Sequence, residues 1–260
     1  MNLSALVGIL MAFAVFIGAA VTSVSDMRIF LDFHAFLIVI GGTLAASLIS
    51  FSGKTMVMLG KIFLKRVLGK NDEIKTAIEE LVDLARGYRE NDAYLKDKIP
   101  AIKTPFLKEA LEMMTEGGID PQDVDKILAK RAAAVQARYD ADADMFKSLA
   151  KFPPAFGLLG AVIGMIALMQ NLGGADAFKK VGPSMAIALV ATMYGIAVAN
   201  FIFLPLGENL SKANRFDQTI RLIVIDGIKL VRIKKHPIVV EESLKSYLLP
   251  TERDNIKKAA

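Results

Sequence analysis

The 260-residue sequence contains no cysteine and no tryptophan, and its only histidines are His34 and His236. Without cysteine the chain forms neither disulfides nor thiolate metal sites, and only two histidines, far apart, argue against a histidine-rich metal centre. The sequence also lacks a glycine-rich phosphate loop, a nucleophile elbow and a pair of carboxylates in a catalytic context. These absences argue against an enzyme, a bound metal and a cofactor.

The sequence is rich in long apolar runs. Hydrophobic residues make up 53% of the chain, while 23% of the residues are charged, which predicts a membrane part and a polar part. Four segments approach the roughly 20 apolar residues that a bilayer core requires: about 3–21, 35–52, 155–172 and 184–206. We predict that the first is retained rather than cleaved as a signal peptide, because no basic residue precedes it and a second span follows closely. The predicted fold is all-α, with four transmembrane helices and a helical cytoplasmic domain.

Lysine and arginine are distributed unevenly along the chain. Residues 53–150 contain 17 of them and residues 207–260 contain 11, whereas the short segments 22–34 and 173–183 contain one and two. Because basic residues concentrate on the cytoplasmic side of a membrane protein, we predict that both termini are cytoplasmic. Residues 53–150 also contain 17 acidic residues, so the net charge of +5 does not indicate a nucleic-acid-binding surface.

Four parts are therefore expected in chain order. Residues 1–52 form an N-terminal transmembrane hairpin, and residues 53–150 form a cytoplasmic helical domain. Residues 151–206 form a second, pore-lining transmembrane hairpin, and residues 207–260 form cytoplasmic helices and a polar tail.

Within the cytoplasmic domain, the spacing predicts a helix over residues 73–99. Its apolar stripe consists of Leu81, Leu84, Tyr88, Leu95 and Ile99. The opposite side of a continuous helix carries the charged residues Arg86, Arg89, Lys96 and Asp97. Asp92 falls on the apolar side, and Gly87 and Asn91 weaken the middle of the helix, which favours a kink there.

Other cytoplasmic segments also have helical signatures. Residues 61–69 are basic and amphipathic, as in a helix on the inner leaflet. A helix is expected over residues 106–116, and Asp120 with Pro121 predicts the start of another that runs to about residue 150. Residues 219–233 are apolar but contain charges, which indicates a buried cytoplasmic helix rather than a fifth span.

The third and fourth spans have no acidic or basic residue in their cores, but many small ones. These small residues are Gly157, Gly160 and Gly164 in the third span, and Ala188, Gly195 and Ala199 in the fourth. Small residues let helix backbones approach closely in lipid, and ordinary helix packing is the commonest reason for them. An ion conductor needs a titratable or coordinating group within the membrane, and here only Thr192, Gln170, Asn200 and backbone carbonyls are available. A partner is therefore expected to supply the charge.

Two of these motifs carry a family resemblance. Pro154-Ala155-Phe156-Gly157 with Gly160 and Gly164, and Gly182-Pro183 through Thr192-Met193-Tyr194-Gly195, resemble the A subunits of bacterial flagellar stators (MotA and PomA type). These belong to the wider family of ExbB and TolQ proteins. The resemblance covers nearly the whole chain, and four spans favour the flagellar branch because ExbB-like and TolQ-like subunits have three.

The resemblance implies a ring, a pentamer in this family, in the bacterial inner membrane around two B subunits (MotB type). The B subunit supplies an intramembrane aspartate, and ion flow drives the rotor protein FliG during flagellar rotation and chemotaxis. The family's functional prolines match Pro154 and Pro205. Its rotor-facing pattern, Arg followed eight residues later by Glu, is matched by Arg89 and Asp97, whereas Arg86 places Tyr94 at the acidic position.

The resemblance also bears on the ion. Sodium-type stators carry threonine in the third span, where this chain has Ala161, whereas Thr192 of the fourth span is present. This favours protons over sodium as the translocated ion. Two alternatives stay open: an ExbB-like or TolQ-like energiser of another periplasmic or outer-membrane process, and a passive scaffold that moves no ions.

Overall fold

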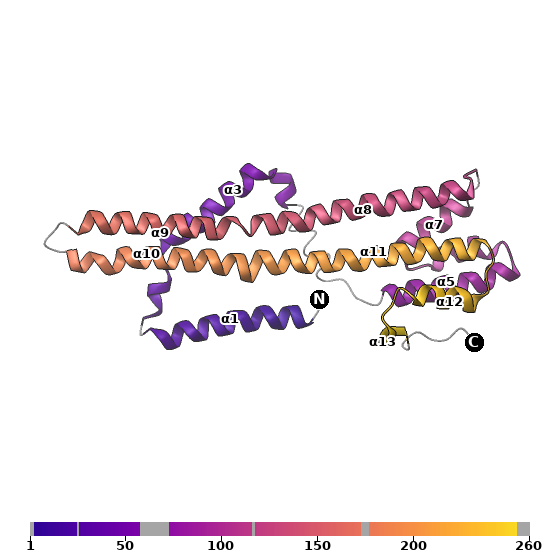
Figure 1. Ribbon diagram of the computed structural model, residues 1–260, viewed down its shortest axis with the longest axis horizontal. Helices are drawn as coiled ribbons and strands as arrows, with labels where there is room; N and C mark the ends of the chain where they lie inside the picture. The colour runs from indigo at the N-terminus through magenta and orange to yellow at the C-terminus, as the bar shows by residue number, and fades with distance from the viewer. Residues whose placement is uncertain (1–2, 25, 58–72, 116–117, 173–176, 254–260) are drawn as a thin grey trace. The chain divides into compact units, whose positions relative to one another are not determined.

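The computed structural model describes residues 3–24, 26–57, 73–115, 118–172 and 177–253. All regular secondary structure within these ranges is helical (Figure 1). The predicted amphipathic helix at 61–69 and the last residues of the polar tail lie outside them.

The chain divides into two compact units. Unit 1 comprises Met1–Gly69 and Asp140–Ser211, and unit 2 comprises Lys70–Tyr139 and Lys212–Ala260.

Unit 1 begins with two apolar helical runs. The first is α1 (Leu3–Ser23), and the second consists of α2 (Phe33–Phe36), the π-helical segment η2 (Leu37–Gly41) and α3 (Gly42–Ser50). The Asp32 carboxylate accepts the backbone N–H of Ala35 at 2.7 Å, so a side-chain cap sets the start of the second run.

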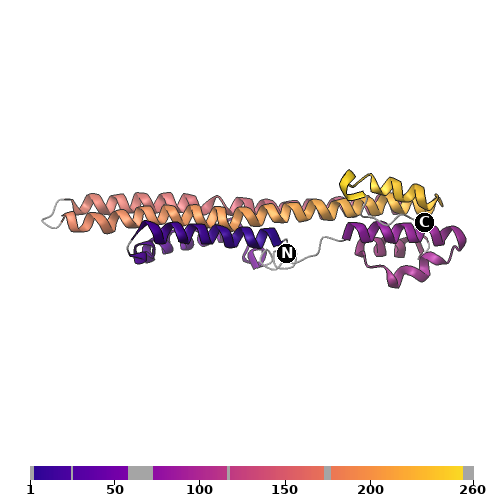
Figure 2. The ribbon, with the colours of Figure 1, turned by 90° about the horizontal axis from the view of Figure 1, so that it is seen from below.

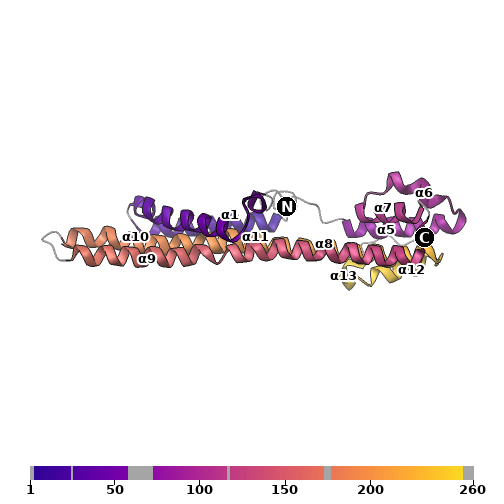
Figure 3. The ribbon, with the colours of Figure 1, turned by 90° about the horizontal axis from the view of Figure 1, so that it is seen from above.

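The second helical pair of unit 1 is α9 (Phe152–Asn171) and α10 (Ala177–Val198). The two helices run antiparallel and side by side in all three views (Figure 1, Figure 2 and Figure 3). After α10 the chain continues through a π-helical turn, η4 (Ala199–Phe203), into α11 (Leu204–Arg232). This widened turn lies just before Pro205, which has no N–H to donate to the regular helix hydrogen bonds.

Three helical stretches within the described residues are long and apolar enough to cross a membrane: Met27–Ser50, Pro121–Gln170 and Val181–Arg232. A fourth apolar stretch, Leu10–Ser23 within α1, is shorter. Large apolar side chains are exposed on these helices, for example Val15, Leu158 and Leu189, each with 66% of its surface accessible. Such surfaces are unfavourable in water and suit lipid or a partner helix. The fold is therefore that of an all-α membrane protein.

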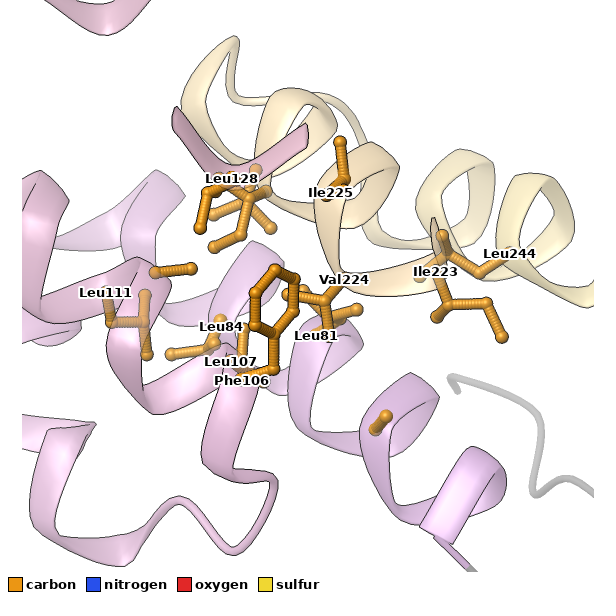
Figure 4. Packing of buried hydrophobic residues seen from close by; sticks show 14 of the residues in the cluster. Leu81, Leu84, Phe106, Leu107, Leu111, Leu128, Ile223, Val224, Ile225 and Leu244 are labelled. Carbon is orange, nitrogen blue, oxygen red and sulfur yellow. The ribbon is translucent and has the colours of Figure 1, made fainter. Parts of the chain in front are cut away.

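Unit 2 is a group of helices around one apolar core. Its elements are α5 (Glu73–Glu90), α6 (Tyr94–Lys98), η3 (Ile99–Ala101), α7 (Pro105–Thr115), the first part of α8 (Pro121–Leu149), the last part of α11, α12 (Pro237–Lys245) and α13 (Pro250–Arg253). Figure 4 shows the core residues contributed by α5, α7, α8, α11 and α12.

This core confirms two expectations. Leu81, Leu84 and Leu95 of the predicted apolar stripe are buried, and Tyr88 and Ile99 pack against them. The apolar part of α11 is also buried, with Ile223, Val224 and Ile228 fully enclosed. Apolar residues at helical spacing predicted the first buried face, and an apolar segment that contains charges predicted the second.

The helix predicted over residues 73–99 is interrupted after Glu90. The Asn91 side chain accepts the N–H of Ala93 at 2.9 Å, which stabilises a turn. The Tyr94 ring then lies 2.2 Å from the point where a Gly87 Cβ would be, so α6 folds back onto α5. The prediction that Asp92 lies on the apolar side was wrong: the turn exposes it, and it pairs with Lys234 at 2.5 Å.

Local signals set the ends of α7 and α8. The Asp120 carboxylate accepts the N–H of Gln122 at 2.9 Å and α8 begins at Pro121, as predicted. Gly118 has a φ of +86°, which favours glycine. The start of α7 has a remote cap instead, because Glu80 of α5 accepts the backbone N–H of Lys103 at 2.6 Å and that of Thr104 at 3.3 Å.

Candidate functional site

The contact between α9 and α10 is close enough to bring the two backbones together. A Cβ on Gly195 would lie 2.5 Å from the Pro153 carbonyl oxygen and 3.1 Å from the Pro154 Cα. A Cβ on Gly157 would lie 2.9 Å from the Ala191 carbonyl oxygen. Side chains at these two positions would collide with main-chain atoms of the facing helix, which cannot rotate away.

The same packing continues along the pair. A Cβ on Gly160 would lie 2.5 Å from the Ala191 Cβ, and one on Gly164 would lie 2.8 Å from the Ala188 Cβ. Ala188 and Ala199 are both buried. The structure thus places the predicted glycines and Ala188 at the α9–α10 contact, where small side chains permit the approach of helices in lipid.

Thr192 lies at this contact, and its hydroxyl is partly buried. Its Oγ1 donates to the carbonyl of Ala188 at 3.1 Å and approaches that of Gly157 at 3.4 Å. A hydroxyl has one proton and two lone pairs, so a proton committed to backbone carbonyls leaves the lone pairs to accept hydrogen bonds or bind a cation.

The other predicted pathway residues are less closely grouped. Pro154 belongs to the same contact through Gly195. Ala161 lies half-buried on α9, one turn beyond Gly157. Pro205 lies in the first turn of α11, after the π-helical turn. The structure therefore brings Thr192 and Pro154 to one helix–helix contact, whereas Pro205 lies beyond the end of α10.

Two contacts of unit 1 escaped the sequence reasoning. The Tyr194 hydroxyl donates to the Phe30 carbonyl, and so links α10 to the segment before α2. The Phe156 ring lies 2.3 Å from the point where a Gly42 Cβ would be, which joins α9 to α3. A tyrosine in an apolar run was the available signal, because a buried hydroxyl needs a hydrogen-bond partner.

The charged residues predicted to face a rotor lie on two successive helices of unit 2. Arg86 and Arg89 are exposed on α5, and Lys96 and Asp97 are exposed on α6. They do not form one face of a continuous helix, since the turn at residues 91–93 separates the two pairs.

Three side chains hold α6 against α5. The Tyr94 hydroxyl donates to Asp83 at 3.0 Å, and Lys98 pairs with Asp83 at 3.1 Å. Hydrogen bonding to Tyr94, and then to Asp83, raises the pKa of Lys98, so this residue keeps its positive charge. The clamp fixes the position of Lys96 and Asp97 relative to α5.

Within the described residues, no group of three or more histidine, aspartate or glutamate side chains is placed to hold a metal ion. The features that stand out are the tightly packed apolar helices and the exposed charges. Together with the spanning lengths, they define an α-helical membrane protein with a polar helical unit.

Comparison with known proteins identifies the family. The model of the MotA/TolQ/ExbB proton channel family matches residues 98–221. Motility protein A of Bacillus subtilis (strain 168) is 31% identical, with 97% of this chain and 93% of that protein covered. Chemotaxis protein PomA of Vibrio alginolyticus is 29% identical, with 95% of this chain and 96% of that protein covered. The chain belongs to the MotA/TolQ/ExbB proton channel family, a family of channels and not of enzymes.

Solved structures agree with this assignment. The flagellar MotAB stator complex from Bacillus subtilis matches with a TM-score of 0.84 at 28% identity, covering 97% of this chain and 98% of that one. The C. jejuni MotAB structure matches with a TM-score of 0.85 at 21% identity, covering 96% of this chain and 97% of that one. The second match supports the fold alone.

Proposed function

We propose that this chain is the A subunit of a bacterial flagellar stator, which conducts ions together with a B subunit and converts their flow into torque on a rotor. The observation that carries the proposal is the likeness to the Bacillus subtilis MotAB stator complex over 97% of the chain. The uncharged cores of α9 and α10 support it, because a conductor without an intramembrane acid depends on a partner for one.

The proposed topology has four spans, with both termini in the cytoplasm of a bacterial inner membrane. The distribution of lysine and arginine supports this orientation. We propose the same four parts as above: the hairpins 1–52 and 151–206, and the cytoplasmic parts 53–150 and 207–260. The exposed apolar side chains of α9 and α10 support assembly into a ring, a pentamer by family resemblance, around B-subunit helices.

The proposed ion path follows the contact between α9 and α10. Thr192 offers lone pairs to the ion, and Ala161 takes the place of a second hydroxyl. Pro154 near the start of α9 and Pro205 near the start of α11 both lie toward the same end of this antiparallel pair. Since a proton needs only a carboxylate and a chain of water, whereas sodium needs several oxygens at once, this lining favours protons.

Conductance with and without the partner tests this function. We expect proteoliposomes containing this chain alone to show no proton flux above protein-free vesicles, because its spans contain no acid. Flux is expected when the chain is reconstituted with a B subunit from the same genome, and not when the intramembrane aspartate of that subunit is replaced by asparagine. Equal flux with and without the B subunit contradicts the proposal. Absence of flux in both preparations favours a passive scaffold.

Gene deletion distinguishes a flagellar stator from an energiser of another envelope process. Cells without the gene are expected to assemble normal flagella but not to swim. Cells that swim normally and instead lose an outer-membrane transport function would support an ExbB-like or TolQ-like role.

The exposed charges of unit 2 are the proposed contact with the rotor protein FliG. We expect Arg89→Glu and Asp97→Lys each to lower swimming speed at normal membrane level, because each reverses an exposed charge. Single changes are expected to act only partly, since an exposed ion pair contributes about 0.2–1 kcal/mol. The control is Lys130→Glu, a charge reversal at an exposed position of α8. If all three variants swim at the wild-type speed, this surface is only exposed to solvent and does not contact the rotor.

A further inference from the structure

A polar residue interrupts the apolar surface where α10 passes into α11. Asn200 is exposed, and its Nδ2 donates to the Ile196 carbonyl at 2.9 Å. An amide has two N–H donors and an acceptor oxygen, so this bond leaves Oδ1 and the second N–H available to a ligand. Polar side chains within membrane spans generally face a partner or a water-filled path rather than lipid.

The backbone around Asn200 is also unusual. It belongs to the π-helical turn Ala199–Phe203, and the N–H of Leu204 donates to the Ala199 carbonyl. The next residue, Pro205, has no N–H. At most one helical donor, the N–H of Leu206, therefore remains for the carbonyls of Asn200 and Phe201. At least one of these two carbonyls has no helical partner.

Hydrocarbon does not satisfy such a carbonyl. Non-helical backbone at membrane depth is tolerated only where protein buries it or where it lines a water-filled cavity. One side of the turn packs on α1, where the rings of Phe13 and Phe16 lie 6.2 and 6.0 Å from that of Phe201, whereas the side that carries Asn200 is exposed. A water-filled path supplies donors for both the carbonyl and Oδ1.

Asn200 lies about a quarter of a turn around the helix from Thr192, towards the exposed side. Eight residues separate them, which at 3.6 residues per turn corresponds to a rotation of about 80° and a rise of about 12 Å. The exposed residue Ile196 lies between them, about 40° around the helix from each. A cation that passes Thr192 and continues along the helix therefore meets the Asn200 turn next.

We propose that Asn200 and the π-helical turn form a second polar site on the ion path, which binds the translocated proton in hydrated form about 12 Å from Thr192. The proposal rests on the function proposed above. The acceptor oxygens of the amide and of the free carbonyl stabilise the positive charge, while the amide N–H orients a water molecule. Since no group in the turn titrates, the site passes the proton on without trapping it.

Proton flux through the complete complex with its B subunit tests this site. We compare Asn200→Leu, which removes both polar atoms at similar size, with Asn200→Gln, which retains an amide. The control is Ile196→Leu, an apolar exchange one turn away on the same face. Flux is measured in proteoliposomes at fixed pH gradient and voltage, together with the amount of reconstituted complex and its ratio of A to B subunits.

We expect Asn200→Leu to lower the flux about tenfold at unchanged subunit ratio, equivalent to about 1.4 kcal/mol in the barrier. Asn200→Gln and Ile196→Leu are expected to stay within about twofold of wild type, a change of under about 0.5 kcal/mol. If Asn200→Leu does not assemble, Asn200→Ala replaces it, because alanine is small and favours helix.

Wild-type flux in an assembled Asn200→Leu or Asn200→Ala complex overturns the proposal. Loss of the B subunit from both variants also overturns it, since the amide would then serve contact with a neighbouring helix. Absence of flux in the wild-type complex is a separate result, which refutes the proposed function itself.

Discussion

Replacing Gly195 with alanine is expected to abolish motility, whereas replacing Gly182 with alanine in the same helix is expected to leave it unchanged. The added Cβ at Gly195 would lie 2.5 Å from the Pro153 carbonyl oxygen, while one at Gly182 meets nothing within 4 Å. Main-chain atoms cannot rotate away, so α9 and α10 must separate. Overpacking of this kind costs about 1–3 kcal/mol, and it changes the helix pair that lines the proposed path.

The two substitutions make a matched pair. Both replace glycine by alanine within α10, an exchange that favours a helix by about 1 kcal/mol, although Gly182 also precedes Pro183. A larger defect for Gly195→Ala than for Gly182→Ala reports the contact with α9, because the strain of a Cβ before Pro183 acts only on the Gly182 variant. The measurements are swimming speed, the amount of chain in the membrane, and the thermal unfolding of the detergent-solubilised complex with its B subunit. Normal motility and unfolding temperature for Gly195→Ala would show that the helices tolerate a wider separation.

Swimming is expected to stop when a protonophore removes the proton gradient, and to persist when sodium is removed from the medium. The physical reason is the composition of the path, in which Ala161 offers no oxygen and Thr192 offers one hydroxyl. Sodium requires several oxygen ligands once it sheds its water, whereas a proton moves between a carboxylate and water. A sodium-channel blocker such as phenamil is expected to have little effect.

The ion dependence is measured as swimming speed against external sodium at fixed pH and fixed proton-motive force. A speed that rises with sodium under these conditions contradicts proton coupling. The variant Ala161→Thr adds the missing hydroxyl but is not expected to convert the motor to sodium, because residues of the B subunit share the site.

Features of local origin were predictable from the sequence. The start of α8 follows from Asp120 and Pro121, because a cap depends on atoms only a few residues apart. The buried face of α5 follows from the spacing of Leu81 and Leu84, because periodicity decides which side chains of one helix share a face. Leu95 is also buried, but on α6 after the turn, where the spacing of a continuous helix no longer applies. The apolar runs follow from length and composition.

Features that depend on distant segments were not predictable. The cap of α7 comes from Glu80, 23 residues before the N–H of Lys103 that it accepts. The partner of Tyr194 is the Phe30 carbonyl, 164 residues away. Neither pairing has a sequence signature, since each exists only after other helices have packed.

The sequence by itself thus determined that the chain is helical, that it enters a membrane, and that its spans contain no charge of their own. Only the tertiary structure decided where the helix after Glu90 breaks, which atoms Gly157 and Gly195 approach, and that Asn200 lies in a π-helical turn. The physical reason is the range of the forces involved. Hydrophobic periodicity and capping act within one or two turns of the chain, whereas backbone approach and hydrogen-bond partners depend on how helices distant in sequence pack together.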